Sequence, residues 1–142
     1  MSRPATQQAN IEPVLRWAFL GAILITTGIG FVLGSSLTPI LEEDMSLLLL
    51  AAFLVIASGQ IIVTRYVVLP GVIANPTPDK NPAAIAYGFA EAPATYGLVL
   101  AIMAGEGWMA LPVGGVALVG WQIMRSYLAA REAAVPEDFP TL

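Results

Sequence analysis

The chain has 142 residues, of which 57% are hydrophobic and only 11% are charged, and its mean hydropathy is +0.77. A typical soluble domain is about one-quarter charged, so this chain has too little polar surface to coat a soluble globule, and lipid must solvate most of it. Six basic residues and a net charge of −4 exclude a nucleic-acid-binding patch, and the absence of cysteine and histidine excludes thiolate chemistry and the commonest metal ligand.

Four apolar runs follow a polar N-terminal segment, residues 1–13. Each run reaches the roughly 20 residues that a helix needs to cross the hydrocarbon core, and a helix satisfies its own backbone hydrogen bonds there. We predict an all-α integral membrane protein whose four transmembrane helices form an antiparallel bundle within residues 14–130, with cytoplasmic tails at 1–13 and 131–142. The expected spans are about 14–34, 45–73, 83–104 and 108–128.

The positive charges predict the orientation of this bundle. In a four-span layout all the basic residues fall on one side, namely Arg3, Arg16, Arg65, Lys80, Arg125 and Arg131. The first and third loops carry only carboxylates. Because Lys and Arg are enriched in cytoplasmic loops, we expect both termini and the proline-containing loop at 75–82 to be cytoplasmic. We expect a multi-pass protein of a bacterial cytoplasmic membrane.

Small residues on the first and fourth spans offer surfaces for close helix packing. Gly30 and Gly34 form a GxxxG step on the first span, and Gly114, Gly115 and Gly120 lie on the fourth. Such spacing lets two helix backbones approach closely. It predicts packing within the bundle, and the alternative is a face for self-association or for other membrane subunits.

One carboxylate stands inside the third span, in the stretch GFAEAPATYGLVLAIMAG at 88–105. Glu91 lies about 12 Å along this helix, where a charged side chain costs about 2.5–3.5 kcal/mol. A carboxyl group there usually stays protonated, because leaving water disfavours the charged form. Since such a group can take up and release a proton, we expect Glu91 to bind an ion or a proton, with a purely structural polar contact as the alternative.

Neighbouring residues bear on that choice. Pro93 cannot donate a hydrogen bond to the carbonyl of Phe89, so this acceptor is free near Glu91, unless the proline serves only as a helix kink. Arg65 on the second span is a possible ion-pair partner of Glu91. Counting inward from the start of that span places Arg65 at the cytoplasmic face and Gln60 about 7.5 Å deeper, which makes Gln60 the better neighbour.

The stretch around Glu91 resembles the carboxylate-bearing outer helix of the proteolipid, subunit c, of rotary ATP synthases. That family shows Ala-Glu-Ala-x-Ala-x-Tyr-Gly-Leu-Val, and the matching positions are Ala90, Glu91, Ala92, Ala94, Tyr96, Gly97, Leu98 and Val99. The segment ASGQIIVTR and the loop after it resemble the end of the family's inner helix and its polar loop, so the likeness covers about residues 45–104.

The resemblance implies a role for each of these positions. Glu91 would be the carrier carboxylate and Gln60 a co-ligand of the ion, while the loop at 75–82 would face a soluble partner. Sodium-type members carry a hydroxyl residue after the glutamate, and Ala92 stands here, so the resemblance implies a proton. Pro93 is near the position of a proline in some members, and Tyr96 and Gly97 hold the register of the motif.

Two functional classes follow, and neither is an enzyme. The first is a proteolipid-like membrane subunit in which Glu91 takes part in proton translocation. The second is an accessory or assembly subunit of a larger membrane complex, in which Glu91 is structural. The register around Glu91 favours the first class, and the bulky second span favours the second. We expect the lipid bilayer and other membrane subunits as partners, and no cofactor, metal or nucleic acid.

Overall fold

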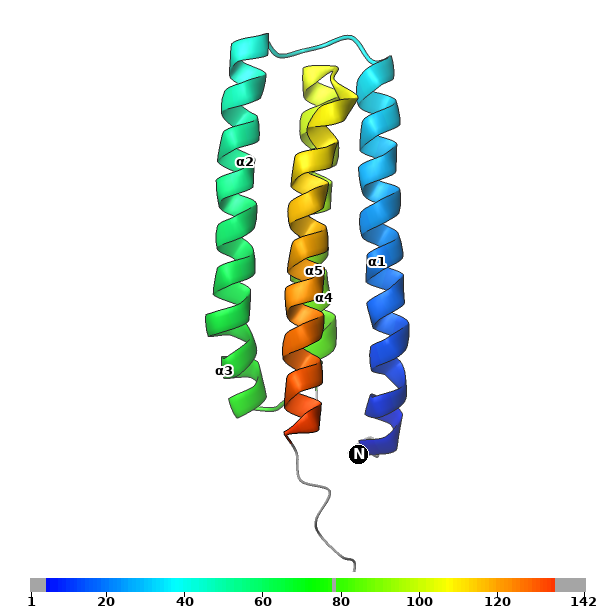
Figure 1. Ribbon diagram of the computed structural model, residues 1–142, viewed down its shortest axis with the longest axis vertical. Helices are drawn as coiled ribbons and strands as arrows, with labels where there is room; N and C mark the ends of the chain where they lie inside the picture. The colour runs from blue at the N-terminus through cyan, green and yellow to red at the C-terminus, as the bar shows by residue number, and fades with distance from the viewer. Residues whose placement is uncertain (1–4, 78, 135–142) are drawn as a thin grey trace, which may run out of the picture.

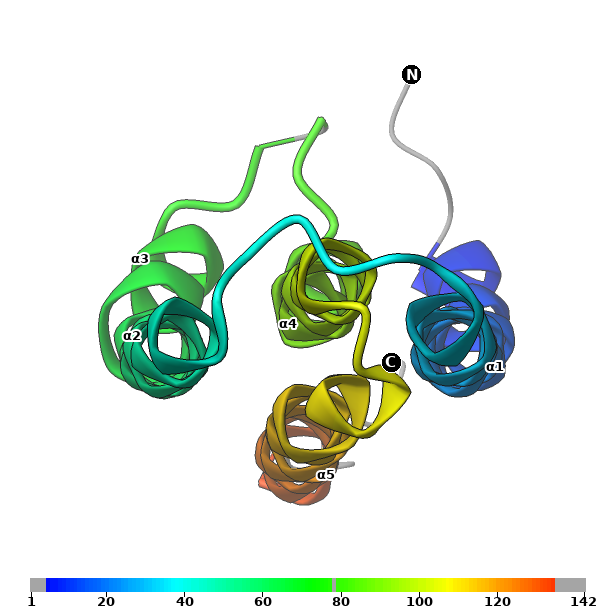
Figure 2. The same ribbon diagram turned by 90° about the horizontal axis from the view of Figure 1, so that it is seen from above.

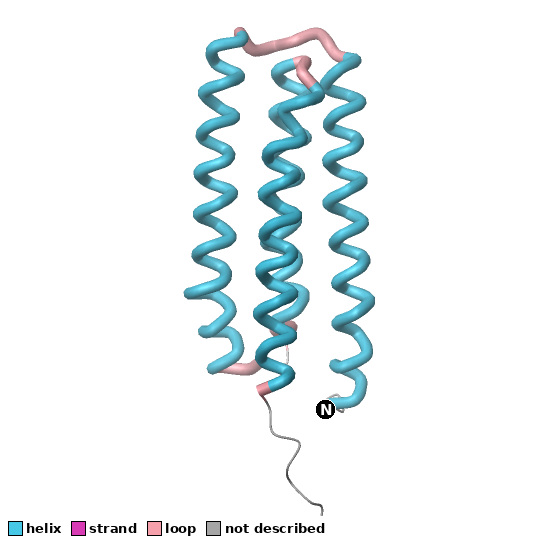
Figure 3. The backbone as a smooth tube through the Cα atoms, viewed as in Figure 1, coloured by secondary structure: helices cyan, strands magenta, loops and turns pink. Residues whose placement is uncertain are grey.

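The computed structural model describes residues 5–77 and 79–134 and shows long helices side by side (Figure 1). Within these residues all regular secondary structure is helical (Figure 3). In chain order the elements are α1 (Ala5–Ser36), α2 (Glu43–Val63), the π-helical turn η1 (Thr64–Val68), α3 (Leu69–Ala74), α4 (Pro82–Ala104), the 3₁₀ turn η2 (Gly107–Met109) and α5 (Ala110–Ala133). The predicted fold class is confirmed: four helical stretches are long and apolar enough to cross a membrane, Ile11–Ser36, Glu43–Ala74, Pro82–Ala104 and Gly107–Ala133.

The helix bounds differ from the predicted spans mainly at one end of the bundle. The first helix begins at Ala5 instead of residue 14, and the last continues to Ala133 instead of residue 128. The second crossing continues to Ala74 because a wider turn absorbs Pro70, whose missing N–H would otherwise serve the carbonyl of Tyr66. Arg3 and most of the predicted C-terminal tail lie outside the described residues.

The helices alternate in direction along the chain (Figure 1). The start of α1, the loop between α3 and α4, and the end of α5 therefore lie at one end of the bundle, as the charge pattern requires. The basic residues of the described chain all lie in the half of the bundle nearest this end, either on the helices or in the loop between α3 and α4. At the opposite end, the two loops 37–42 and 105–106 carry only acidic charges.

The third crossing, α4, occupies the centre of the arrangement. Seen along the helix axes, α4 lies between α1 and α2, and α5 lies on its third side (Figure 2). In the most apolar stretch of each crossing, 44% of the residues of α4 and 50% of those of the last crossing are buried. The corresponding shares are 17% for α1 and 22% for the second crossing. The outer surfaces of α1 and α2 are therefore the most exposed helix surfaces of the molecule.

Glycines allow α1, α4 and α5 to approach closely. A Cβ atom added to Gly30 would lie 3.0 Å from the Cα of Leu98, and one added to Gly34 would lie 2.7 Å from the carbonyl oxygen of Ala101. On α5, Gly114 packs in the same way against Thr27. Gly30, Gly34 and Gly114 are thus used inside the bundle, as the first of the two interpretations held, whereas an added Cβ at Gly115 has no neighbour within 4 Å.

The two ends of α4 are held by specific hydrogen bonds. The side chain of Asn81 caps the start and accepts from the backbone N–H of Ala83 at 2.9 Å. At the other end Gly105 adopts a left-handed conformation with φ of 64°, which favours glycine because it has no Cβ. The N–H of Ile40 then donates to the carbonyl of Met103 at 2.9 Å, so the loop after α1 also positions α4.

Candidate functional site

The side of α4 between α1 and α2 is not covered by a helix of the described chain (Figure 2). We call it the open face of α4, and it is marked by the exposed residues Phe89, Thr95 and Val99. Phe89 is 41% and Val99 is 45% exposed. Glu91 lies at one edge of this face and Tyr96 at the other, so the open face separates two polar groups at similar depth.

Glu91 lies on the edge of the open face that borders α1. Residues three and seven positions apart share one side of a helix, and Gly88 and Leu98, at these spacings from Glu91, both approach α1: Gly88 near Phe19 and Leu98 near Gly30. The Glu91 side chain is half-buried. Its carboxylate oxygen Oε1 accepts a hydrogen bond from the hydroxyl of Thr95, one turn further along α4, at 3.4 Å.

Gln60 serves the opposite edge, which borders α2. Its amide nitrogen donates to the carbonyl oxygen of Phe89 at 3.2 Å, and its amide oxygen accepts from the Tyr96 hydroxyl at 2.9 Å. The ring of Tyr96 stacks on Phe53 of α2, with the centroids 5.9 Å apart. These contacts tie α2 to α4 at the level of Glu91.

The sequence-based interpretation of this site needs two corrections. The carbonyl of Phe89, freed by Pro93, is indeed used, but its donor is Gln60 and not the carboxyl group of Glu91. Gln60 lies at the predicted depth, yet it faces Phe89 and Tyr96. Position 91 is about 200° around the helix from position 89, so Gln60 and Glu91 belong to different edges of the open face.

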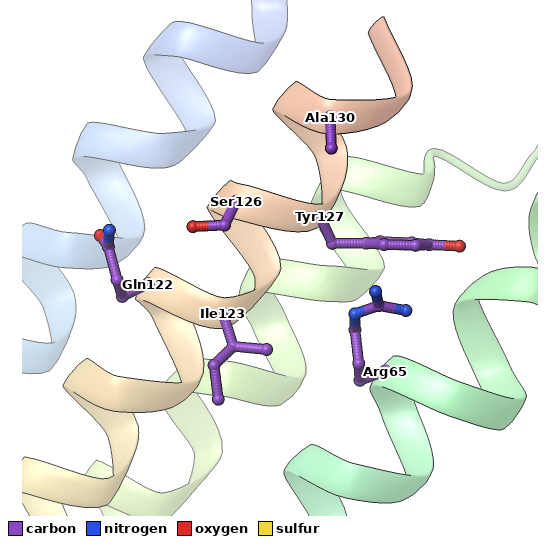
Figure 4. Close-up of a pocket in the computed structure, with 6 residues that line it drawn as sticks. All are labelled: Arg65, Gln122, Ile123, Ser126, Tyr127 and Ala130. Atoms are coloured by element: carbon purple, nitrogen blue, oxygen red, sulfur yellow. The ribbon is translucent and has the colours of Figure 1, made fainter. Parts of the chain in front are cut away.

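Arg65 also has a different partner from the one considered. Its guanidinium carbon lies 3.6 Å from the centre of the Tyr127 ring on α5 and 5.1 Å from that of Tyr66 (Figure 4). Such stacking is a cation–π contact. In the described part of the chain the ion pair between Arg65 and Glu91 is not formed, because Arg65 faces α5 while Glu91 lies beside α1.

The proline and the glycine of the motif lie in the interior of the bundle. Pro93 is fully buried. A Cβ atom added to Gly97 would lie 3.1 Å from the carbonyl oxygen of Ala110, so Gly97 is a contact between α4 and α5. Pro93 and Gly97 therefore shape the packing of α4, while Tyr96 bonds to α2.

A second polar cluster was missed from the sequence. Tyr87 is fully buried, and its hydroxyl donates to a carboxylate oxygen of Glu12 at 2.6 Å. The indole N–H of Trp121 donates to the carbonyl of Arg16 at 3.0 Å, so this cluster joins α1, α4 and α5. The sequence analysis places Glu12 in a polar tail. The residues between Pro4 and Glu12 include no glycine or proline and are compatible with a helix, and they indicate that α1 starts earlier.

Within residues 5–77 and 79–134 no group of three acidic, His or Cys side chains could hold a metal ion. No family model, no curated protein and no solved structure matches this chain. Function is therefore inferred from the arrangement of the side chains. Glu91 is the described carboxylate that lies well inside a membrane-spanning helix, away from both ends.

Proposed function

We propose that this protein is a membrane subunit in which the Glu91 carboxyl group takes up and releases a proton within the bilayer, as in a proteolipid-like component of a proton-translocating complex. The observation that carries the proposal is the position of Glu91: half-buried, at the edge of the open face, with the neutral hydroxyl of Thr95 as its hydrogen-bond partner.

The depth of Glu91 supports this proposal. It lies nine residues after Pro82, about 13 Å along a helix of about 34 Å. An ionised carboxylate this far inside hydrocarbon is costly, and intramembrane ionisable residues of this kind usually have a function. A proton is the simplest ion for a single carboxyl group with one neutral hydroxyl beside it, because it needs no further ligands.

The open face provides a route by which a proton donor or acceptor can reach Glu91. Next to the open face, between α2 and α4, lies a groove of about 400 Å³ whose lining includes the small residues Ala84, Gly88 and Ala92. Small side chains leave room for a helix of another subunit to pass close to α4. A cationic or hydrated group on such a helix would favour the charged form of Glu91, which would release its proton. When that helix moves away, the neutral form is favoured again and Glu91 would take up a proton.

The proposal includes an orientation and a location. The end of the bundle with Arg65, Lys80 and Arg125 would face the cytoplasm of a bacterium, because positive residues accumulate on that side of a membrane. The loops at the opposite end, 37–42 and 105–106, carry no Lys or Arg, as this assignment requires.

A second candidate is an accessory or assembly subunit in which Glu91 is structural. The exposed surface of α2 favours it, since large apolar residues cover this surface, among them Val55 at 73% and Ile62 at 57% exposed. Such a surface suits lipid and also suits the helices of a larger complex.

The two candidates predict different chemistry at Glu91. A membrane-soluble carbodiimide reacts with protonated carboxyl groups in apolar surroundings. In membrane vesicles that contain the chain with its native partners, we expect labelling at Glu91 that falls as the pH rises. Glu91→Gln should abolish both the labelling and proton flux while the unfolding temperature stays unchanged.

The matched control is Glu106→Gln. Glu106 lies in the loop after α4 and accepts a hydrogen bond from the indole N–H of Trp108, so its loss should leave labelling and proton flux intact. If Glu91 never reacts at any pH, or if Glu91→Gln retains full proton flux, the accessory function is the correct one.

A further inference from the structure

A pocket of about 340 Å³ lies between η1 and α5 (Figure 4). Its lining residues are Arg65, Gln122, Ile123, Ser126, Tyr127 and Ala130. They include one cation, three further side chains that can donate hydrogen bonds, and no carboxylate. The pocket opens to the surroundings, since Gln122, Ser126 and Ala130 are exposed.

Arg65 presents its hydrogen-bond donors at this pocket. The guanidinium group lies over the Tyr127 ring, so the ring contacts its flat face. A guanidinium has five N–H donors in its own plane, and stacking on a ring leaves these edge donors to other acceptors. In Figure 4 the guanidinium lies against the Tyr127 ring, and the Tyr127 hydroxyl is at the end of that ring farther from Gln122 and Ser126. An acceptor that enters the pocket would meet a fork of N–H groups.

The pocket lies at the depth of the lipid headgroups. A hydrocarbon core takes about 20 helical residues to cross. Counting this length from Met45, after the acidic first turn of α2, reaches Arg65; from Ser36 at the end of α1 it reaches Arg16; and from Glu106 it reaches Ser126. Three separate helices thus place the boundary between hydrocarbon and headgroups at the same level, that of Arg65, Arg16 and Ser126.

Aromatic side chains mark the same plane. Trp17, next to Arg16, is 62% exposed, and Tyr66, next to Arg65, is 69% exposed. Trp and Tyr concentrate at the boundary between hydrocarbon and headgroups, and basic pockets between helices on the cytoplasmic side bind anionic headgroups. Phosphate groups of lipids lie at this depth, so a phosphate is an acceptor that Arg65 can meet there.

We propose that the pocket binds a phosphate group, supplied by an anionic lipid headgroup or by free phosphate. Two N–H groups of Arg65 would donate to two phosphate oxygens, the pairing for which the planar fork is suited. The Tyr127 hydroxyl would donate to the same phosphate, and the polar rim of Gln122 and Ser126 would contact the rest of a headgroup. This site does not depend on the function proposed for Glu91.

Native mass spectrometry of the purified full chain tests the site. The chain is titrated with phosphatidylglycerol and, separately, with zwitterionic phosphatidylcholine. We expect one phosphatidylglycerol molecule to bind in preference, and Arg65→Gln to weaken its binding by about tenfold or more, since hydrogen bonds to charged groups contribute most. Arg131→Gln is the matched control, because Arg131 is exposed at the end of α5, and it should bind like the unmodified chain.

Further variants keep the test decisive if Arg65→Gln does not fold. Arg65→Lys retains the charge and loses the fork, so binding should fall several-fold, whereas Tyr127→Phe retains the stacking ring and should lose less. The proposal is overturned if Arg65→Lys binds phosphatidylglycerol as well as the unmodified chain does. It is also overturned if Arg65→Gln binds this lipid as well as the control Arg131→Gln does. Displacement of the lipid by inorganic phosphate would support the site and assign it to free phosphate; a lipid that inorganic phosphate does not displace would assign it to the headgroup.

Discussion

The central helix α4 is held in different ways on its two flanks. Toward α1 the backbones touch: an added Cβ on Gly34 would lie 2.7 Å from the carbonyl oxygen of Ala101. Toward α2 the contact is made by side chains, the hydrogen bonds of Gln60 and the stacking of Phe53 on Tyr96. The first flank is an extended fit of surfaces, and the second is a small set of directional contacts.

This difference follows from the solvent. Lipid is as apolar as a leucine side chain, so apolar residues gain little by leaving it, and helices associate through close van der Waals packing and interhelical hydrogen bonds. Glycine contacts add up over a whole helix, whereas each hydrogen bond contributes about 0.6 kcal/mol on average. We infer that α1, α4 and α5 form the stable unit and that α2 is the crossing that separates most easily.

The largest expected loss of stability is that of Gly34→Ala, which disturbs the close contact between α1 and α4. The added methyl group would meet backbone atoms of Ala101 and Gly107, neither of which can rotate away. Overpacking of this kind typically costs about 1–3 kcal/mol, and we expect the upper end of that range. The measurement is the free energy of unfolding in mixed detergent micelles.

Gly28→Ala is the control on the same helix, since a Cβ atom there has no neighbour within 4 Å. It should change the stability by less than about 0.5 kcal/mol. Equal losses for Gly34→Ala and Gly28→Ala would show that helix propensity, and not backbone contact, determines the effect.

A smaller effect is expected from Gly114→Ala on α5. Its new Cβ would meet the side chain of Thr27, including the Cγ2 atom at 2.6 Å, and a threonine in a helix has little rotamer freedom. We expect a loss of about 1–2 kcal/mol. The adjacent Gly115→Ala should be nearly neutral, because a Cβ there has no neighbour within 4 Å.

Thr27→Ala provides a rescue of Gly114→Ala. It removes Oγ1 and Cγ2, the two atoms nearest the new methyl group, and leaves only the Cβ atom of residue 27 at 3.1 Å. The lost Oγ1 is a buried oxygen for which the described residues provide no hydrogen-bond partner. The double variant should recover most of the lost stability in the same unfolding assay. Failure of the rescue would mean that Gly114 matters for a reason other than its contact with Thr27.

The smallest expected effect lies on the polar flank. Gln60→Leu removes the bonds to Phe89 and Tyr96, and we expect a loss of about 1 kcal/mol, with Tyr96→Phe losing about half as much. A double-mutant cycle of the two should give a coupling energy near 0.6 kcal/mol. If Gln60→Leu costs more than Gly34→Ala, the comparison is reversed and α2 belongs to the stable unit.

The position of a residue along the bundle axis could be predicted from the sequence, but rotation about the helix axis could not. Counting residues placed Gln60 at the level of Glu91, and the structure puts Gln60 between Phe89 and Tyr96, on either side of that level. The rise per residue is constant along a helix, so such counting holds. Which face of α4 meets α2 depends on how the helices pack.

Apolar periodicity could not supply the missing rotation. A soluble helix shows its buried side through polar residues on the other, but a membrane helix is apolar all round. The GxxxG step on α1 was the exception, because glycine spacing itself indicates a contact surface, and Gly30 and Gly34 do pack against α4 and η2. Glu12 and Tyr87 had no such pattern, and only folding brings them together.

The sequence by itself determined that the chain forms four helices long enough to cross a membrane and that one carboxyl group lies inside a span. It also determined which helix ends lie together, namely the start of the first, the loop between the second and third, and the end of the fourth. These properties depend on hydropathy, length and charge, which are additive along the chain. The tertiary structure decided that α4 is central, that Glu91 borders α1 while Gln60 bonds across the other edge, and that Arg65 faces α5. These depend on how helices rotate to fit one another, and that fit involves all of the helices at once.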